Sequence, residues 1–281
     1  MRRIMINNPT AQYYDENYED YATGWSEDHI HYGLWYEDTK THEESLINTT
    51  KKAVEHLSIQ RNDKVLDAGC GTGGSCRYIA QHFECEVYGI VLSNELINAA
   101  YQITKKMKHY NKPTIFLMDF LNTGFKDESF SKIYSIESMI HARSKKSYIE
   151  EVYRILRKKG KIVIMDYFLL KNKLTKDDEK IYNEWLNGWF LQPAFPLKKF
   201  DKLLKKQGFT SIYFEDITPL IRESSILMHQ SAENLLPQVH AKVLSGELPA
   251  SRLHHTLANY RQKECFDRGI IMYGLFAAVK G

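Results

Sequence analysis

Apolar positions recur at helical spacing between residues 41 and 57, and from residue 64 onward short apolar runs alternate with amphipathic segments. Short apolar runs predict strands, whereas apolar residues spaced three and four apart predict helices. The pattern predicts strands at residues 64–67, 84–91, 114–118, 130–136, 161–165, 212–215 and 269–279. It predicts helices at residues 41–57, 74–83, 94–109, 145–157 and 200–207.

This alternation of strands and helices predicts an α/β fold. We expect a Rossmann-like, seven-stranded, mostly parallel sheet with helices on both faces. Two segments with a helical pattern, at about 175–195 and 220–267, fall outside that minimal unit. Because insertions after strand ends usually build the ligand crevice, we expect these two to form helical lids. The predicted division is an N-terminal helical lid segment, 1–60, and a core domain, 61–281.

Composition narrows the class of protein. The 281 residues, 43% of them hydrophobic, are ample for one large domain with a core. A net charge of +3 gives no reason to expect a nucleic-acid partner. No run of about 18 apolar residues occurs, so we expect no membrane span. Four cysteines without a CxxC pair favour a reduced, cytoplasmic protein without a metal site. The pattern leaves the oligomeric state open.

The segment VLDAGCGTGG, residues 65–74, joins the first core strand to the first core helix. Gly69 and Gly71 allow positive φ and let the main chain approach a ligand without a Cβ in the way. The helix start that follows offers unpaired N–H groups. Asp67 precedes the glycines, where a carboxylate repels phosphate and attracts an ammonium or sulfonium group. The GxGxG spacing, and Val91 in place of an acid, count against a NAD-dependent oxidoreductase.

VLDAGCGTGG resembles the first motif of class I S-adenosylmethionine-dependent methyltransferases. The resemblance extends through YGIVLSNELINAA, FLMDF and YSIESMIHARSKKSYIEEVYRILRKKGKIVIMDYF, which are similar to later strand and helix segments of that family. It implies S-adenosylmethionine as cofactor and methyl transfer as the reaction. HIHYGLWYEDT resembles the subgroup that methylates tocopherols, sterols, prenyl diphosphates, glycine and sarcosine, which implies a small-molecule acceptor.

The resemblance also implies cofactor-binding residues. Asp119 would accept a hydrogen bond from the adenine amino group and Phe120 would pack on the ring, although a helix-capping role is the alternative for Asp119. The usual ribose-binding acid is missing, and Ser93 is a candidate for that contact. In the family a tyrosine of the N-terminal segment often touches the carboxylate end of the cofactor. The predicted cofactor-binding residues are Tyr14, Asp67, Gly69, Cys70, Gly71, Ser93, Asp119 and Phe120.

Glu137 and His141 follow the predicted strand 130–136 and are the predicted catalytic residues. Their spacing would place them on one face of a helical turn, at the crevice end of the strand. An oxygen or nitrogen acceptor would use His141 as general base. A carbon acceptor would pass through a carbocation that Glu137 and aromatic faces stabilise. A satisfied structural histidine is the alternative for His141.

Aromatic residues concentrate in the N-terminal segment and in the first insertion. Their rings would close over a sulfonium cation or line an apolar acceptor pocket, and simple helix packing is the alternative. The predicted acceptor-binding residues are Trp25, Trp35, Trp185 and Trp189.

We therefore predict a methyltransferase that acts on a small, largely apolar metabolite. The favoured acceptor atom is a carbon on a prenyl, sterol or polycyclic scaffold. The nearest alternative is N- or O-methylation of a small natural product or amine. A further alternative is a protein of this fold that binds the cofactor without transferring a methyl group. Near-neutral charge disfavours transfer to RNA or protein.

Overall fold

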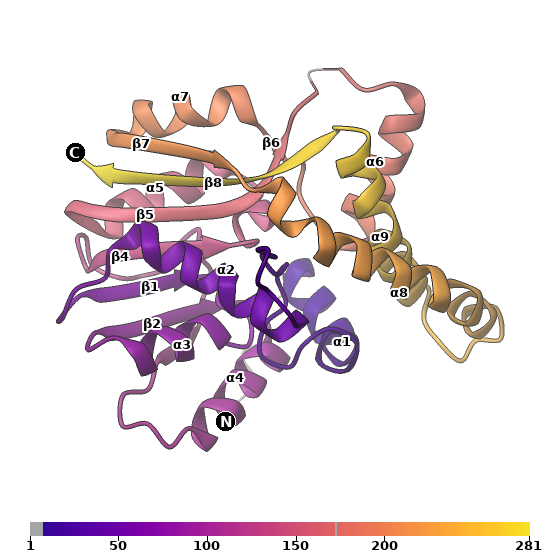
Figure 1. Cartoon of the computed structure of the whole chain (residues 1–281), viewed down its shortest axis with the longest axis horizontal. Helices are drawn as coiled ribbons and strands as arrows, with labels where there is room; N and C mark the ends of the chain where they lie inside the picture. The colour runs from indigo at the N-terminus through magenta and orange to yellow at the C-terminus, as the bar shows by residue number, and fades with distance from the viewer. Residues whose placement is uncertain (1–7, 172) are drawn as a thin grey trace.

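The computed structural model describes residues 8–171 and 173–281. In that part of the chain the strands form one sheet in the order β3-β2-β1-β4-β5-β8-β7, and a two-residue strand, β6, pairs with β5 (Figure 1). β8 is antiparallel to β5 and β7, whereas the other pairs are parallel. The predicted mostly parallel sheet is confirmed. Its strands are β1 Lys64–Ala68, β2 Glu86–Val91, β3 Thr114–Leu117, β4 Phe130–Ile136, β5 Leu156–Leu169, β6 Phe195–Pro196, β7 Phe209–Asp216 and β8 Ile271–Lys280.

Helices cover both faces of the sheet, because successive side chains of a strand point to opposite faces. Val65 of β1 joins an apolar cluster with helices α2 and α3, whereas its neighbour Leu66 joins a second cluster with α5 and α7. The helices are α1 Pro9–Gly24, α2 His42–Leu57, α3 Gly74–His82, α4 Asn94–Lys106, α5 Lys145–Ile155, α6 Lys176–Gly188, α7 Leu197–Gln207, α8 Thr218–Leu244 and α9 Ala250–Asp267. A 3-10 turn, η1, spans Met139–His141.

The boundary between α5 and β5 differs from the predicted one. The helix ends at Ile155 and the strand begins at Leu156, where the pattern placed it at residue 161. Residues 157–159 are charged and exposed, so this part of the strand carries no apolar signal. Pairing of Leu156 with Phe130 of β4 extends the strand instead. Tertiary pairing here overrides the local pattern.

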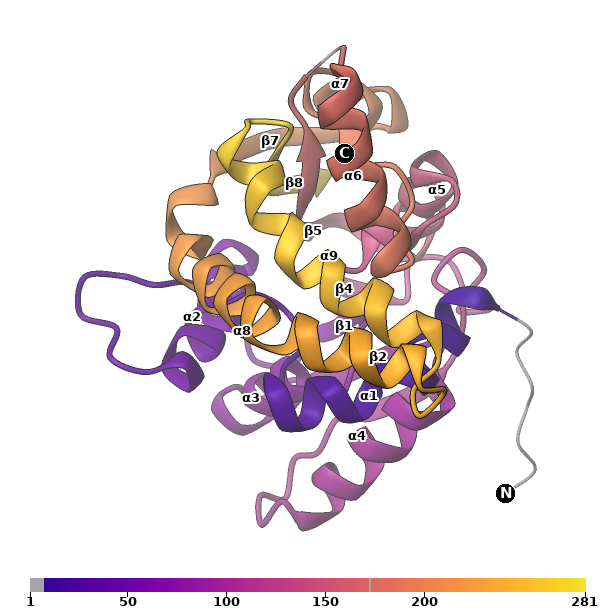
Figure 2. The same ribbon diagram turned by 90° about the vertical axis from the view of Figure 1, so that its right-hand side faces the viewer.

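The two insertions are helical, as predicted. The first contains α6, and the second contains α8 and α9, which pack against each other. α9 also packs against α6. Figure 2 looks onto this end of the molecule and shows α8 and α9 lying across it, with α1 close to α4. No helix in the described ranges is long and apolar enough to cross a membrane.

The predicted N-terminal segment, 1–60, contains two helices of different placement. α1 lies against α4, and α2 packs on the sheet beside β4 and β5. Residues 1–7 lie outside the described residues. The division at residue 60 stays a prediction.

Candidate active site

The glycine segment forms a tight turn between β1 and α3. Gly69, Gly71 and Gly73 all have positive φ, at 123°, 54° and 84°. A Cβ on Gly69 would lie 2.2 Å from the Cβ of Ser138, so the turn packs directly against the segment after β4. Gly73 is the N-cap residue of α3. Because glycine has no side chain, no side-chain oxygen accepts from the first N–H groups of the helix. The backbone therefore presents free donors next to the strand end.

A cavity lies over this turn, with an empty volume of about 1120 Å³ that includes solvent at its mouth. Ligand pockets are commonly ~300–1,000 Å³, so the space suits a cofactor and a small acceptor together. Residues from the ends of β1, β2 and β4 line one side, and residues from α1, α8 and the segment after α6 line the other. Predicted site residues that line it are Tyr14, Asp67, Gly69, Cys70, Gly71, Ser93, Phe120, Glu137, His141 and Trp189.

Asp67 ends up buried at the carboxyl end of β1, facing the cavity. Cys76 Sγ donates to its Oδ2 at 3.6 Å. Burial raises the pKa of the Asp67 carboxyl to about 7, although hydrogen bonds from Tyr134 and Cys76 lower it. A bound cation would draw this carboxyl into its charged form.

Two predicted cofactor residues have local structural partners. Ser93 caps α4 by accepting from the Leu96 N–H at 3.1 Å, and its hydroxyl donates to Asp15 of α1. Asp119 accepts from the Leu121 N–H at 2.8 Å and is not among the residues that line the cavity. The Ser93 bond is a helix cap, whereas the Asp119 bond closes a turn and no helix begins there, so the helix-capping alternative for Asp119 is wrong. Contact of either residue with a cofactor stays a prediction.

Glu137 is the most constrained side chain of the site. Its φ is 51°, a left-handed conformation that costs about 1–3 kcal/mol for a residue with a Cβ. Oε1 accepts from the Tyr32 N–H at 2.7 Å and from the Tyr273 hydroxyl at 2.9 Å. Oε2 accepts from the Tyr167 hydroxyl at 2.6 Å. Burial raises the pKa of Glu137 to about 7, although these three hydrogen bonds lower it.

His141 lies on η1, one turn beyond Glu137. Its Nε2 is 2.9 Å from the Tyr14 hydroxyl of α1. Its Nδ1 is buried without a hydrogen-bond partner in the described chain. Burial and the Lys145 ammonium lower the pKa of His141 to about 4, so the ring is neutral at pH 7.

The four tryptophans separate into two groups. Trp189 lines the cavity, and its indole N–H donates to Asn259 at 2.6 Å. The other three are not among the cavity-lining residues. Trp185 is fully buried in the core, whereas Trp25 and Trp35 donate their indole N–H groups to the His31 carbonyl and to Ser224. Acceptor binding by any of them stays a prediction.

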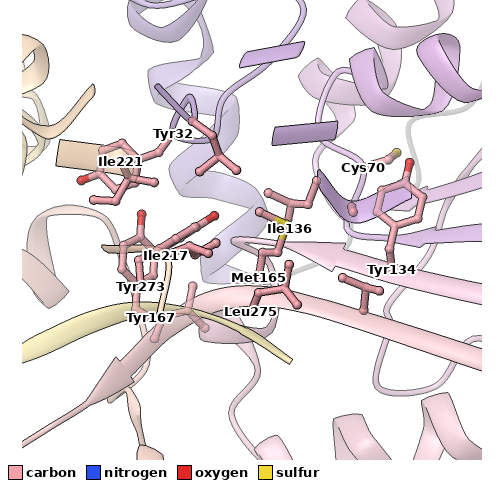
Figure 3. Close-up of a cluster of buried hydrophobic side chains, with 14 of the residues drawn as sticks. Tyr32, Cys70, Tyr134, Ile136, Met165, Tyr167, Ile217, Ile221, Tyr273 and Leu275 are labelled. Atoms are coloured by element: carbon pink, nitrogen blue, oxygen red, sulfur yellow. The ribbon is translucent and has the colours of Figure 1, made fainter. Parts of the chain in front are cut away.

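The tyrosines around Glu137 were missed by the sequence analysis. Tyr167 and Tyr273 are direct partners on the antiparallel β5 and β8, and Tyr32 comes from the segment between α1 and α2. Figure 3 shows these three side chains gathered on one side of the buried cluster, with Cys70 and Tyr134 on the other. Tyr32 and Tyr167 lie within quoted segments that resemble the family, HIHYGLWYEDT and the one that ends in MDYF, whereas Tyr273 carried no signal. Residues 167 and 273 are brought together by strand pairing alone.

Comparison with known proteins agrees with this geometry. A model of the family described as mycolic acid cyclopropane synthetase matches residues 6–234. The chain belongs to this family. Sterol 24-C-methyltransferase ERG6 of Saccharomyces cerevisiae is 28% identical over 217 residues, which are 75% of this chain and 55% of that protein. The O-methyltransferase cnsE of Penicillium expansum is 27% identical over 236 residues, 83% of this chain and 84% of that one. The chain thus spans about half the length of the sterol methyltransferases that it matches.

Solved structures share the fold. The [4+2]-cyclase SpnF has a TM-score of 0.78 at 19% identity, with 96% of this chain and 94% of that chain covered. Geranyl diphosphate C-methyltransferase of Streptomyces coelicolor, in complex with Mg²⁺, geranyl diphosphate and S-adenosyl-L-homocysteine, has a TM-score of 0.74 at 16% identity, with 98% of each chain covered. The predicted class I methyltransferase fold and its subgroup are confirmed.

Proposed function

We propose that this chain transfers a methyl group from S-adenosylmethionine to a carbon atom of a small, apolar acceptor. The observation that carries the proposal is Glu137, a partly buried carboxyl with a pKa near 7 that lines the cavity at the end of β4. Family membership and the sterol 24-C-methyltransferase relatives support methyl transfer to carbon. The sheet order and the glycine turn support S-adenosylmethionine as cofactor.

The residues that would hold the cofactor fit its chemistry. S-adenosylmethionine supplies an electrophilic methyl group on a sulfonium sulfur. Asp67 and the free N–H groups of the glycine turn suit the ammonium and carboxylate of its amino-acid end. Phe120 supplies an apolar face for the adenine. Gly69, Gly71 and Cys70 would line the path between the two ends.

The pKa values favour Glu137 over His141 as the group that handles a proton or a positive charge. A general base works best when its pKa lies near the working pH. Glu137 meets that condition, whereas His141, with a pKa of about 4, is a weak base at pH 7. Methyl transfer to an alkene carbon creates a carbocation that must lose a proton. Glu137 would stabilise this charge and accept the proton, assisted by the ring of Tyr167.

Alignment and exclusion of water account for the remaining catalysis. Holding the acceptor carbon, the methyl group and the sulfur in line is worth about 7–11 kcal/mol. Tyr14 of α1 and Met228 of α8 both line the cavity, so the helices that carry them would close over the reactants.

O- or N-methylation is the second candidate, because cnsE is a relative of matching length. In that case the free Nδ1 of His141 would accept the proton of the acceptor. The free, buried cysteines also support our inference that the chain acts in the cytoplasm, in small-molecule metabolism.

Label transfer from methyl-labelled S-adenosylmethionine tests the proposal. The acceptors are a sterol with a side-chain double bond, geraniol, an indole, a polycyclic phenol and ethanolamine, and mass spectrometry locates the label. We expect label on carbon and its loss in Glu137→Gln. Label on oxygen or nitrogen that depends on His141 would replace carbon transfer with the second candidate. Bound cofactor without label on any acceptor would contradict the proposed reaction.

A further inference from the structure

We propose that the acceptor is an uncharged molecule and that this site excludes acceptors that carry a phosphate or diphosphate group. The inference rests on the proposed function and names the acceptor class of the same cavity. It separates this chain from fold neighbours such as geranyl diphosphate C-methyltransferase, whose acceptor is a diphosphate.

The cavity contains no cation that could hold a phosphate. Among its lining residues in the described chain there is neither lysine nor arginine. Its charged side chains are acids, Asp28, Asp67 and Glu137. Burial of an unpaired anion is unfavourable, and a nearby carboxylate adds repulsion.

The two buried cations beside the cavity are already occupied. Arg77 of α3 donates to the Thr72 carbonyl at 2.6 Å and pairs with Asp28 at 2.8 Å. Lys145 of α5 donates to the carbonyls of Ile140 and Ala142 at 2.7 and 3.0 Å. Recruiting either cation to a phosphate would break these bonds and leave buried carbonyl groups unpaired.

The histidines of the cavity do not supply the missing charge. His29, His31 and His141 line it, and burial is the main cause that lowers the pKa of all three. The pKa values of His31 and His141 fall to about 4, and that of His29 falls well below its usual value. All three rings are neutral at pH 7.

The tyrosine hydroxyl groups at the cavity are also occupied, and the free N–H groups of the glycine turn are those that suit the carboxylate of the cofactor. Tyr167 donates to Glu137, and the Tyr14 hydroxyl is paired with His141. The Tyr32 hydroxyl donates to Gln262 at 2.5 Å, and those of Tyr13 and Tyr21 are 2.8 Å apart. A phosphate in this cavity would therefore meet few free hydroxyl groups.

A bridging metal ion would be the remaining way to hold a diphosphate. No group of three or more His, Cys, Asp or Glu side chains in residues 8–171 and 173–281 could hold a metal. The surface left for an acceptor is apolar, since Ile140, Trp189, Leu191 and Met228 line the cavity together with the aromatic rings. This surface favours burial of a hydrocarbon acceptor.

The test compares matched acceptors that differ only in charge. Geraniol and geranyl diphosphate, and farnesol and farnesyl diphosphate, are titrated into the protein saturated with S-adenosylhomocysteine, with and without Mg²⁺. Inorganic pyrophosphate is the probe that does not depend on the scaffold. We expect each alcohol to bind at least tenfold more tightly than its diphosphate, and pyrophosphate to show no binding at millimolar concentration. Equal or tighter binding of either diphosphate, or saturable binding of pyrophosphate, overturns the inference.

A gain-of-binding variant gives a second measurement. Met228→Lys places an ammonium group in the cavity, and we expect at least a tenfold gain in affinity for geranyl diphosphate, with Met228→Leu as the matched control. A gain in the leucine variant as well would contradict the electrostatic argument. Failure of the proposed function is a different result: the protein would bind S-adenosylhomocysteine but methylate none of the acceptors, charged or neutral.

Discussion

At the scale of the residue, Glu137 combines three unfavourable features. Its backbone is left-handed, its side chain is partly buried, and desolvation raises the pKa of its carboxyl to about 7. Strain and perturbed pKa values of this kind concentrate at functional sites, because structure alone gives no reason to keep them. Tyr167 and Tyr273 hold the side chain in place from two paired strands.

Replacement of Glu137 by glutamine tests its role in the reaction. We expect kcat to fall by about 10²–10⁴-fold with little change in the KM of the cofactor, because a positioned base or charge is lost and the binding surface is kept. In the unmodified protein kcat should rise with pH as Glu137 loses its proton near pH 7. The variant should lack this rise. Activity of the variant within about threefold of the original would contradict the assignment.

The same substitution has a predictable effect on stability. The pKa of Glu137 is about 7 in the folded protein, against 4.5 ordinarily, so the folded state binds more protons between these values. The contribution of Glu137 to the free energy of unfolding is therefore present below pH 4.5 and is lost as pH rises towards 7. Relative to the original protein, Glu137→Gln should gain about 3 kcal/mol over this window. Urea unfolding at pH 4.5, 5.5 and 7.5 measures it, and a flat difference would contradict the raised pKa.

Two tryptophans form a matched pair for the acceptor side. Trp189 lines the cavity, whereas Trp185 is enclosed by the core. We expect Trp189→Phe to raise the acceptor KM about tenfold, since it removes cavity surface and the bond to Asn259. Trp185→Phe should instead lower the free energy of unfolding by about 1–3 kcal/mol and leave that KM unchanged. The reverse pattern would show that Trp185 reaches the acceptor.

At the scale of the element, α1 is held over the cavity by a few polar contacts. Asp15 accepts from Ser93 and from the Glu95 N–H, the latter at 3.1 Å, where α4 begins. Tyr13 is hydrogen-bonded to His255 at 2.7 Å, and Asp20 is paired with Arg252 of α9. Tyrosines of α1 also pack against the apolar core, so these polar contacts are one part of what holds the helix over the cavity.

Loss of the Asp15 contacts should loosen α1. Two hydrogen bonds of this kind contribute about 1–3 kcal/mol together, so we expect Asp15→Ala to raise the cofactor KM about tenfold and to increase hydrogen exchange in α1. Glu19→Ala, at an exposed position of the same helix, is the control. Equal exchange in both variants would mean that Asp15 does not hold the helix closed.

At the scale of the whole molecule, the parallel strands bring the ends of β1, β2 and β4 to one edge, and the inserted helices cover that edge (Figure 1). Ligands bind at such an edge in open α/β sheets. Because lids and sheet share one cavity, a ligand there stabilises the folded chain as a unit.

Thermal unfolding distinguishes the two cofactors that the glycine turn allowed. S-adenosylhomocysteine at 100 times its Kd should raise the free energy of unfolding by about 2.7 kcal/mol. NADH at the same concentration should leave the melting temperature unchanged, because Asp67 and the GxGxG spacing do not suit a diphosphate. Stabilisation by NADH and not by S-adenosylhomocysteine would instead favour a NAD-dependent oxidoreductase.

Much of the architecture could be predicted because its causes are local. The spacing of apolar residues predicted most core helices and strands, including β4 at its observed bounds, but not the two-residue β6. The glycine segment predicted the turn after β1. The early start of β5 could not be predicted, since residues 157–159 are charged and the strand begins before them only because Leu156 pairs with Phe130 of β4. Periodicity predicts on which face of its own helix or strand a residue lies, but not with which distant strand it pairs.

The sequence by itself therefore determined most helices and strands and the order of the site motifs along the chain. It also determined the candidate site residues Asp67, Glu137 and His141. Only the tertiary structure decided what surrounds them. The donors to Glu137 come from positions 32, 167 and 273. Pairing of β5 with β8 brings residues 167 and 273 together, and the segment between α1 and α2 brings residue 32 to them. Burial then set the pKa of Glu137 near 7 and that of His141 near 4. Burial depends on atoms from the whole fold, so no local pattern contains it.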